Sequence, residues 1–361
     1  MPPTTRILHC SDLHLVHAGE AKEYGLAVLG EILDLAREES VSMVLVSGDL
    51  FDSRRDFEAL LPKVDFLLGE KLEDVPMVLI PGNHEELLRG SGPLKPLSST
   101  RQLHIARELP FGHQVFDGFD LITIPFQSGY GGFEEWPIPP KGDRPRIVAA
   151  HGSVLGASIP EGFVEERDSV LDGELFARCG ADYVALGHIH QGRELIQDGI
   201  PVVYPGSSRV WRQGEVGPRG AYLIEIGEEV AYSRRTLESA GQFREIHLLL
   251  DDSVSQRVAE LSRNWKPTDW VHLSFLGLIS SEEEAERETA GRAESLAGVV
   301  RRVTVDRSEL LVVPEAKDSP LVARFLSEWE RLGEEYRGTE LEDAWEESRI
   351  VGLEKIARAL G

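Results

Sequence analysis

Three short stretches near the start of the chain decide the fold: residues 7–14 read ILHCSDLH, residues 43–52 read MVLVSGDLFD, and residues 77–85 read MVLIPGNHE. Each begins with a run of Val, Ile, Leu or Met, which predicts a short buried β-strand. Each then ends in a group of Asp, His, Asn and Gly residues. Because the carboxyl ends of parallel strands meet at one crevice in an open α/β sheet, we expect these polar groups to lie close together.

Amphipathic stretches separate these strands. Residues 22–39 place Leu26, Leu29 and Leu33 at helical spacing, and residues 57–68 repeat the pattern. Alternation of strand and helix predicts an α/β (α+β) layered domain. Further strands that come closer together are predicted at 121–124, 147–150, 183–186, 202–204 and 222–226. The pattern therefore predicts a second sheet packed on the first, which makes a two-sheet β-sandwich flanked by helices.

The chain is expected to have three parts. Residues 1–237 carry the strands above and form the main domain. Residues 238–313 follow a βαβαβ pattern and are large enough for a small independent domain. Residues 314–361 begin at a Pro-bounded break and read as two helices. One of these helices carries an apolar stripe of Leu321, Phe325, Trp329, Leu332 and Tyr336.

Composition excludes several classes of protein. The chain has 361 residues, 38 Lys and Arg against 62 Asp and Glu, and a formal net charge of −24. Such a charge disfavours a protein that binds nucleic acid through its overall charge. It does not exclude an enzyme that holds metal cations and works with a basic partner. No apolar run is long enough to cross a membrane. The two cysteines, Cys10 and Cys179, are too few for a disulfide framework. We therefore expect a cytoplasmic protein without a membrane segment.

Two later strands also end in histidines. Residues 147–150 run into His151, and residues 183–186 run into the sequence Gly-His-Ile-His, which contains His188 and His190. A set of His, Asp and Asn without thiolates suits Mn²⁺, Zn²⁺ or Fe²⁺ rather than a structural zinc. Each piece alone is more often structural than metal-binding. Their repeated position after strands predicts a metal site.

These motifs resemble those of the calcineurin-like metallophosphoesterases over roughly the first 235 residues. Within that superfamily the chain is most similar to SbcD-type DNA repair exonucleases, relatives of the meiotic-recombination-11 nuclease. SDLHL at residues 11–15, GDLFDS at 48–53 and YPGSS at 204–208 carry this resemblance. It implies that residues 238–313 form a capping domain and that the final helices dock on an SMC-like ABC ATPase of the SbcC type.

The resemblance also implies a two-metal site. It assigns seven ligands, with Asp49 shared by both ions: Asp12, His14 and His190 for the first ion, and Asn83, His151 and His188 for the second. Mn²⁺ is the expected metal, with Zn²⁺ or Fe²⁺ as alternatives. Two such ions would activate water and clamp the oxygens of the scissile phosphate.

The same resemblance gives His84 and Asp52 catalytic roles. His84 would protonate the departing oxygen instead of binding metal. Asp52 would orient His84 and favour its imidazolium form, while the alternative is a solvated turn aspartate. Position 53 is serine, where protein phosphatases have arginine, and this departure disfavours phosphoprotein substrates.

Arginines near the second motif and after YPGSS could reach phosphates that flank the scissile one. These candidate DNA contacts are Arg54, Arg55, Arg209 and Arg212, and Arg219 lies just beyond them with the same possible role. Surface charges that only confer solubility are the alternative. Trp211 could stack on an unpaired base, although we expect it to pack between domains.

The leading functional hypothesis is a Mn²⁺-dependent DNA nuclease with 3′→5′ exonuclease activity and single-strand endonuclease activity. It would act in double-strand break repair as a homodimer with an SMC-like ATPase. The alternative is a phosphodiesterase or phosphatase for small molecules or nucleotides, which would use the same metals. A third class, a scaffold whose site has decayed, is disfavoured by the complete set of motif residues.

Overall fold

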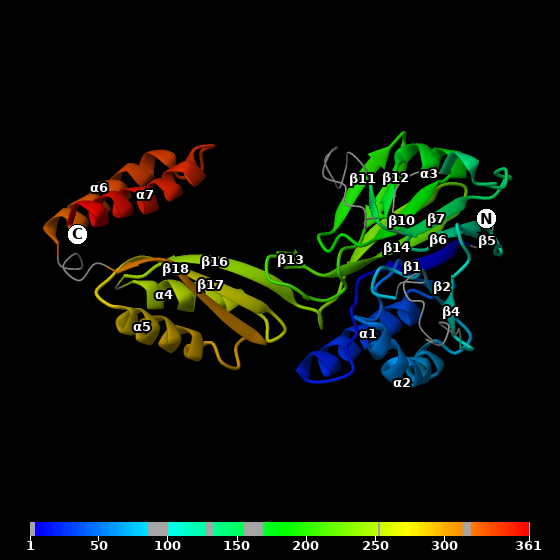
Figure 1. The fold of residues 1–361 in the computed structure, drawn as a ribbon, viewed down its shortest axis with the longest axis horizontal. Coiled ribbons are helices and arrows are strands. Elements are labelled where there is room, and N and C mark those ends of the chain that lie inside the picture. The colour runs from blue at the N-terminus through cyan, green and yellow to red at the C-terminus, as the bar shows by residue number, and fades with distance from the viewer. Residues whose placement is uncertain are drawn as a thin grey trace. The chain divides into compact units, whose positions relative to one another are not determined.

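The computed structural model describes residues 4–85, 100–127, 133–154, 169–251, 253–312 and 319–360. The chain divides into two compact units, Met1–Gly241 and Gln242–Gly361 (Figure 1). The first unit contains all the strand-end motifs. No helix within the described residues is both long enough and apolar enough to span a membrane.

The first sheet of the first unit has the strand order β15-β14-β1-β2-β3-β4. Its strands are β1 (Thr5–Cys10), β2 (Met43–Val46), β3 (Met77–Leu79), β4 (Leu103–Ile105), β14 (Gly220–Ile226) and β15 (Val230–Thr236). Strands β1 to β4 are parallel to one another, whereas β14 is antiparallel to β1. The parallel arrangement brings the ends of β1, β2 and β3 to the same edge.

The second sheet has the order β11-β12-β10-β7-β6-β5. Its strands are β5 (Gly112–Val115), β6 (Asp120–Ile124), β7 (Arg146–His151), β10 (Tyr183–Gly187), β11 (Arg193–Gln197) and β12 (Ile200–Tyr204). The central strands β6, β7, β10 and β12 are parallel. A small pair, β8 (Ser153–Val154) and β9 (Val170–Leu171), and the two-residue β13 (Gly217–Pro218) complete the strands of this unit.

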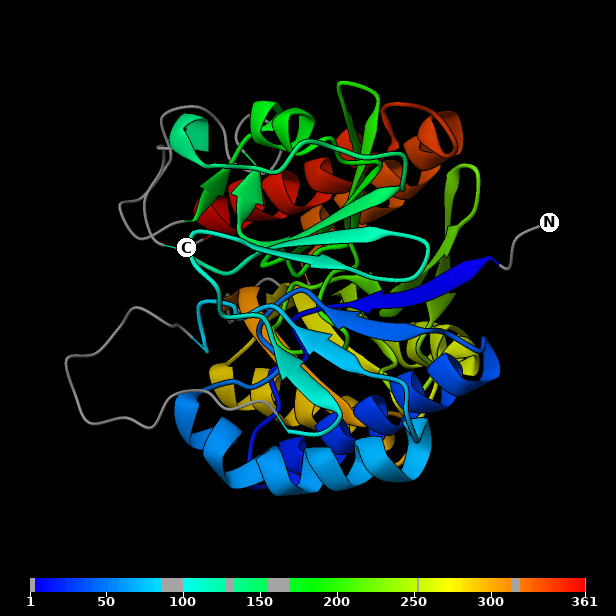
Figure 2. The same cartoon turned by 90° about the vertical axis from the view of Figure 1, so that its right-hand side faces the viewer.

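The two sheets pack face to face (Figure 2). Their shared core contains Ile7, Leu45, Ile147 and Tyr183, all of which are buried. Burial of each such side chain contributes about 1.5–3 kcal/mol to stability. This core confirms the predicted two-sheet sandwich and holds the ends of the central strands in place.

Helices cover the outer faces of the sandwich. The apolar sides of α1 (Glu20–Glu38) and α2 (Arg54–Leu72) pack on the first sheet, and α3 (Gly173–Cys179) packs on the second. Helix α2 begins directly after the second motif because Ser53 is its N-cap, with the Ser53 side chain accepting a hydrogen bond from the Asp56 N–H. A short 3₁₀ helix, Phe133–Glu135, shares the apolar cluster of α3.

The second unit contains the parallel sheet β16-β17-β18. Its elements are β16 (Gln242–Leu249), α4 (Val254–Leu261), a 3₁₀ turn (Ser262–Asn264), β17 (Trp270–Ile279), α5 (Glu282–Ser295), β18 (Arg302–Val312), α6 (Pro320–Tyr336) and α7 (Glu342–Leu360). Helices α6 and α7 form a hairpin in which the rings of Trp329 and Trp345 stack 3.9 Å apart. Leu353 of α7 packs against Leu278 of β17, so the hairpin joins the core of this unit.

Candidate metal centre

Five strand ends bring the motif residues together at one edge of the sandwich. Residues 12–14 follow β1, residues 48–52 follow β2, residues 82–84 follow β3, His151 ends β7, and residues 188–190 follow β10. All seven residues that the sequence nominates as ligands lie in this one cluster. They are Asp12, His14, Asp49, Asn83, His151, His188 and His190.

One group in the cluster consists of Asp12, His14 and His190. Their ligand atoms lie within 4.8 Å of one another. Nε2 of His14 lies 3.1 Å from Nε2 of His190, and Nε2 of His190 lies 3.9 Å from Oδ1 of Asp12. Asp12 and His14 are fully buried. This group has the residue types and the closeness that a divalent cation requires.

A second group contains Asn83, His151 and His188. Oδ1 of Asn83 lies 3.0 Å from Nε2 of His151 and 3.1 Å from Nδ1 of His188. Asp49 lies between the two groups, since its Oδ2 atom is 3.5 Å from Nε2 of His151 and 3.9 Å from Nε2 of His14. A carboxylate in this position could contact cations in both groups.

The contacts within the cluster fit cations better than they fit hydrogen bonds alone. Two facing imidazole nitrogens 3.1 Å apart, as in His14 and His190, either share one proton or direct their lone pairs at one ion. Asp12 and Asp49 are buried carboxylates, and buried charges require partners. These donors therefore form a site that divalent cations would satisfy.

The backbone at the cluster is held in an unfavourable conformation. Asp12, His14, Asp49 and His188 have φ angles of 52°, 46°, 50° and 101°, in the left-handed region that residues with a Cβ rarely adopt. Each such residue costs of order 1–3 kcal/mol, and such strain concentrates at functional sites. The loops are thus shaped to direct these four side chains.

Glycines permit the close approach of the loops. A Cβ at Gly48 would overlap the ring of His151, and its φ of 95° also favours glycine. A Cβ at Gly82 would overlap the carboxylate of Asp49. Both motifs therefore need glycine before the Asp and the Asn that they carry.

Burial and charge set the protonation of the central pair. Burial alone would raise the pKa of Asp49, but the neighbouring His151, with His14 and His84, holds it well below its usual value. Burial would lower the pKa of His151, but Asp49 raises it to about 9. The pair is therefore an ion pair in the metal-free protein, and a bound cation would compete with the proton on His151.

Glu85 supports Asp49 from behind. Its buried carboxyl accepts hydrogen bonds from the backbone N–H groups of Asp49, Phe51 and Gly82, at 2.8–3.0 Å. Burial, followed by the negative charge of Asp49, raises the pKa of Glu85 to about 8. Glu85 thus ties the second and third motifs together.

His84 lies at the edge of the cluster. Its Nδ1 atom is 2.5 Å from the backbone oxygen of Asp52, and its Nε2 atom is 4.0 Å from Oδ2 of Asp49. The Asp52 carboxylate lies between two rings, with Oδ1 3.3 Å from Nδ1 of His14 and 3.5 Å from Nδ1 of His84. The backbone of Asp52 therefore makes the shorter contact with His84. His84 also forms a group with His14 and Asp49 that is compact enough for an ion.

Sequence reasoning missed Glu215. Oε1 of this buried residue lies 2.5 Å from Nδ1 of His190, and Oε2 accepts hydrogen bonds from the Ser207 hydroxyl at 3.1 Å and the Trp211 N–H at 3.0 Å. Burial opposes ionisation, but the contacts with His190 hold the pKa of Glu215 below its ordinary value. A carboxylate that accepts the proton of one ring nitrogen fixes the tautomer and the orientation of the histidine, so that the other nitrogen can bind a metal. Glu215 lies in the loop between β12 and β14. It does not directly follow a predicted strand, so the strand-end pattern could not identify it.

The candidate DNA contacts divide into two kinds. Arg55 and Arg212 are exposed, and Arg54 is half-buried with its Nε 3.5 Å from Oε1 of Glu58. Arg209 is buried, and its guanidinium donates to the backbone oxygens of Leu13 and His14. The burial of Arg209 disfavours the DNA contact predicted for it, because its donors hold the loop of the first motif. Arg219 is also buried and forms an ion pair with Glu215.

Trp211 forms a wall of the cluster. Its ring stacks on His14, with the centroids 5.5 Å apart and the planes 8° apart. The Arg209 guanidinium lies 4.3 Å from the centroid of the same ring. Trp211 therefore packs between the histidine and the arginine, both of which belong to the first unit.

Comparisons with known proteins place this cluster in a family. The model of the calcineurin-like phosphoesterases matches residues 5–192. The DNA double-strand break repair protein Mre11 of Methanopyrus kandleri is 28% identical over 61% of this chain and 54% of its own length. The uncharacterized metallophosphoesterase YhaO of Bacillus subtilis is 27% identical over 61% of this chain and 57% of its length. One component of the nuclease SbcCD of Bacillus subtilis is 24% identical over 65% of this chain and 70% of its length.

The chain spans little more than half the length of the first two of these relatives. The family match covers more than half of the chain and includes all five strand-end motifs. The chain therefore belongs to the calcineurin-like phosphoesterases, a family of divalent-metal enzymes that hydrolyse phosphoesters.

Proposed function

We propose that the chain is a metal-dependent DNA nuclease that acts in double-strand break repair, with 3′→5′ exonuclease activity and single-strand endonuclease activity. The observation that carries the proposal is the convergence of seven ligand-type residues with His84 at their edge. The similarity to proteins named as a break-repair protein and as part of a nuclease favours DNA among the substrates of this family.

The proposed roles follow from position. Asp12, His14 and His190 would hold one ion, and Asn83, His151 and His188 would hold the other, with Asp49 between them. Two divalent cations, which we expect to be Mn²⁺, would supply Lewis acidity to the phosphate and to the attacking water. The protein's contribution is to hold these donors rigidly through buried loops.

His84 would supply the proton for the departing oxygen. Its Nδ1 faces the backbone oxygen of Asp52 and can donate to it, which leaves Nε2 directed toward the cluster. In the imidazolium form both nitrogens carry protons, so Nε2–H can be transferred while Nδ1–H holds the ring. Oδ1 of the Asp52 carboxylate lies 3.5 Å from the same Nδ1 atom.

The net charge of −24 is compatible with DNA as substrate. Surface acids farther than a Debye length of about 8 Å from the site are largely screened at physiological salt. Two divalent ions would also add four positive charges at the point where phosphate binds. We expect weak DNA affinity for the isolated chain and stronger binding together with a basic partner.

The partner that we propose is an SMC-like ABC ATPase, with the nuclease acting as a homodimer. The α6–α7 hairpin supports a docking role because it exposes large apolar side chains. These are Leu321, Leu332, Leu341 and Val351, which are 38–58% exposed. Leu321→Glu should weaken co-purification with the ATPase, whereas Phe66→Glu, at an exposed position of α2, should not. Equal recovery of both variants with the ATPase would refute this role for the hairpin.

The alternative is a small-molecule or nucleotide phosphodiesterase, and the similarity to the uncharacterized metallophosphoesterase YhaO is compatible with it. One assay separates the two. End-labelled single- and double-stranded DNA and bis-p-nitrophenyl phosphate are each incubated with the protein and Mn²⁺. We expect both DNA and the ester to be cleaved. Turnover of the ester with no DNA cleavage, even with the ATPase added, would favour the alternative.

A further inference from the structure

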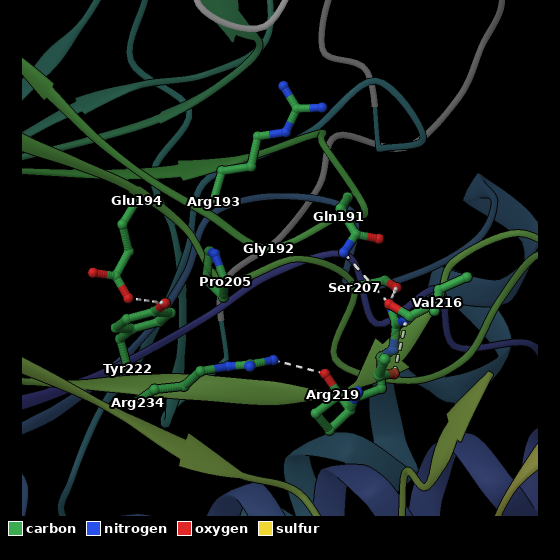
Figure 3. Close-up of a pocket in the computed structure, with 12 residues that line it drawn as sticks. Gln191, Gly192, Arg193, Glu194, Pro205, Ser207, Val216, Arg219, Tyr222 and Arg234 are labelled. Atoms are coloured by element: carbon green, nitrogen blue, oxygen red, sulfur yellow. Dashed lines mark hydrogen bonds between the residues drawn. The ribbon is translucent and has the colours of Figure 1, made fainter. Parts of the chain in front are cut away.

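A pocket of about 330 Å³ lies beside the candidate metal centre in the first unit. Its lining includes Gln191, Arg193, Arg219, Tyr222 and Arg234 (Figure 3). Gln191 directly follows His190 in the chain. Ser207, which also lines the pocket, donates a hydrogen bond to Glu215, the carboxylate that contacts His190. The pocket and the metal centre therefore share one wall.

The pocket carries an excess of positive charge. Three guanidinium groups line it, from Arg193, Arg219 and Arg234, against the single carboxylate of Glu194. Arg219 is buried and forms an ion pair with Glu215, with 3.8 Å between Nη1 and Oε2, so this charge is compensated. The other charged residues of the lining are Arg193, Arg234 and Glu194, so arginines outnumber acidic residues there. This excess stands against a net charge of −24 for the whole chain.

The two outer arginines belong to different strands. Arg193 begins β11 and Arg234 lies on β15, and they extend on opposite sides of the pocket in Figure 3. Both are exposed. Arg234 donates a hydrogen bond from Nη2 to the Pro218 oxygen at 2.6 Å, which holds its side chain along the wall of the pocket. The Glu194 carboxylate is already engaged, since it accepts a hydrogen bond from the Tyr222 hydroxyl at 2.6 Å.

We propose that this pocket binds a phosphodiester group of the nucleic-acid strand whose neighbouring phosphate lies at the metal centre. Guanidinium groups match the geometry of phosphate oxygens and keep their charge at any physiological pH. The volume exceeds that of a phosphate and leaves room for the attached sugar. Arg234 and Arg193 are the binding residues, while Arg219 holds the wall by donating to the His190 oxygen at 3.3 Å and the Ser207 hydroxyl at 3.1 Å.

This proposal rests on the proposed function, with DNA as the substrate. It predicts that loss of the pocket affects an oligonucleotide and a small phosphodiester differently. A small ester such as bis-p-nitrophenyl phosphate has one phosphate, which the metal centre would occupy. An oligonucleotide has further phosphates that could reach the pocket. Loss of Arg234 should therefore affect the oligonucleotide and leave the small ester unchanged.

The test compares Arg234→Gln and Arg193→Gln with Arg37→Gln, which removes an exposed arginine from α1. KM and kcat are measured with bis-p-nitrophenyl phosphate and with a single-stranded oligonucleotide at several salt concentrations. We expect each pocket variant to raise KM for the oligonucleotide about fivefold to thirtyfold. The slope of log(1/KM) against log salt should also become shallower by about 0.7, the value for one phosphate contact on a single strand. The ester kinetics should match those of the wild type.

The proposal is overturned if the pocket variants and Arg37→Gln give the same KM and the same salt slope for the oligonucleotide. If the wild type hydrolyses the ester but not DNA, the proposed function fails, and the pocket is then judged by anisotropy titration of the same labelled oligonucleotide. Weaker binding by Arg234→Gln than by Arg37→Gln would still support the pocket. Equal binding, or none by any variant, would overturn it.

Discussion

The Glu215 carboxylate lies 2.5 Å from Nδ1 of His190, and both residues are held by Arg219, whose Nη1 donates to the His190 backbone oxygen at 3.3 Å. The contact leaves Nε2 of His190 facing Nε2 of His14 at 3.1 Å. The ion pair between Arg219 and Glu215 therefore fixes His190 twice. Glu215 holds its side chain, and Arg219 holds its backbone oxygen. Through His190, the loop that carries Glu215 is thus connected to His14, in the motif that follows β1.

Glu215→Gln should weaken metal binding. The amide keeps the shape of the side chain but removes the charge that favours Nδ1–H on His190, and loss of such a partner lowers metal affinity by roughly 10- to 100-fold. Calorimetric titration of the metal-free protein with Mn²⁺ measures the change. Glu228→Gln, at an exposed acidic residue between β14 and β15, is the control and should bind as the wild type does. Equal Mn²⁺ affinity in folded Glu215→Gln would contradict the role of this contact.

Asp49→Ala should be the most damaging single change at the centre. Because Asp49 lies within 3.9 Å of both His14 and His151, its removal should weaken the binding of both ions and abolish activity. Metal analysis of the purified variant provides the measurement. Two fully occupied ions in Asp49→Ala would show that this carboxylate does not serve both groups.

His84→Ala separates proton transfer from metal binding. We expect the variant to retain both ions and to lose roughly 10²–10⁴ in kcat, the usual contribution of a positioned general acid. Asp52→Asn should also lower kcat, and because the two residues are in contact the double mutant should be far from additive. Loss of an ion from His84→Ala would instead make His84 a ligand, as its closeness to His14 and Asp49 would allow.

The buried His9 predicts a dependence of stability on pH. Burial lowers the pKa of His9 to about 3, from an ordinary value of 6.5. The unfolded chain therefore binds a proton at His9 that the folded chain does not, so stability falls as pH drops from 6.5 toward 3. Between pH 7 and pH 5 this loss amounts to about 2 kcal/mol.

His9→Gln should remove that contribution while keeping a polar group beside Ser47, whose hydroxyl lies 3.0 Å from Nε2 of His9. Urea unfolding at pH 7 and pH 5 gives the two free energies for each protein. The wild type should lose about 2 kcal/mol more than the variant over this range. An equal loss in both proteins would mean that His9 is not held neutral by burial.

The sequence predicted the strands and helices whose pattern of apolar residues matches their burial in the folded chain. Apolar runs such as 43–46 become fully buried strands, and the polar residues after them share one edge because the strands are parallel. Strands β11 and β15 were missed, because they lie at sheet edges and carry exposed residues such as Arg193 and Arg234. The seven-residue α3 was missed because it is too short to show a helical period.

The candidate site was predictable only where its residues follow strands. Asp12, Asn83 and His188 belong to motifs that can be recognised along the chain. Glu215 could not be found, because its contact with His190 depends on the path of a loop. The burial of Arg209 could not be predicted either. In the sequence, an arginine that donates to backbone oxygens cannot be distinguished from one that binds phosphate. The division into a capping domain at 238–313 and a separate C-terminal segment at 314–361 stays a prediction.

Anomalous diffraction from crystals grown with Mn²⁺ tests the central claim most directly. The account predicts two anomalous peaks, one contacted by Asp12, His14 and His190, the other by Asn83, His151 and His188, and Asp49 in contact with both. A single peak, or a second ion held by residues outside this set, would contradict it.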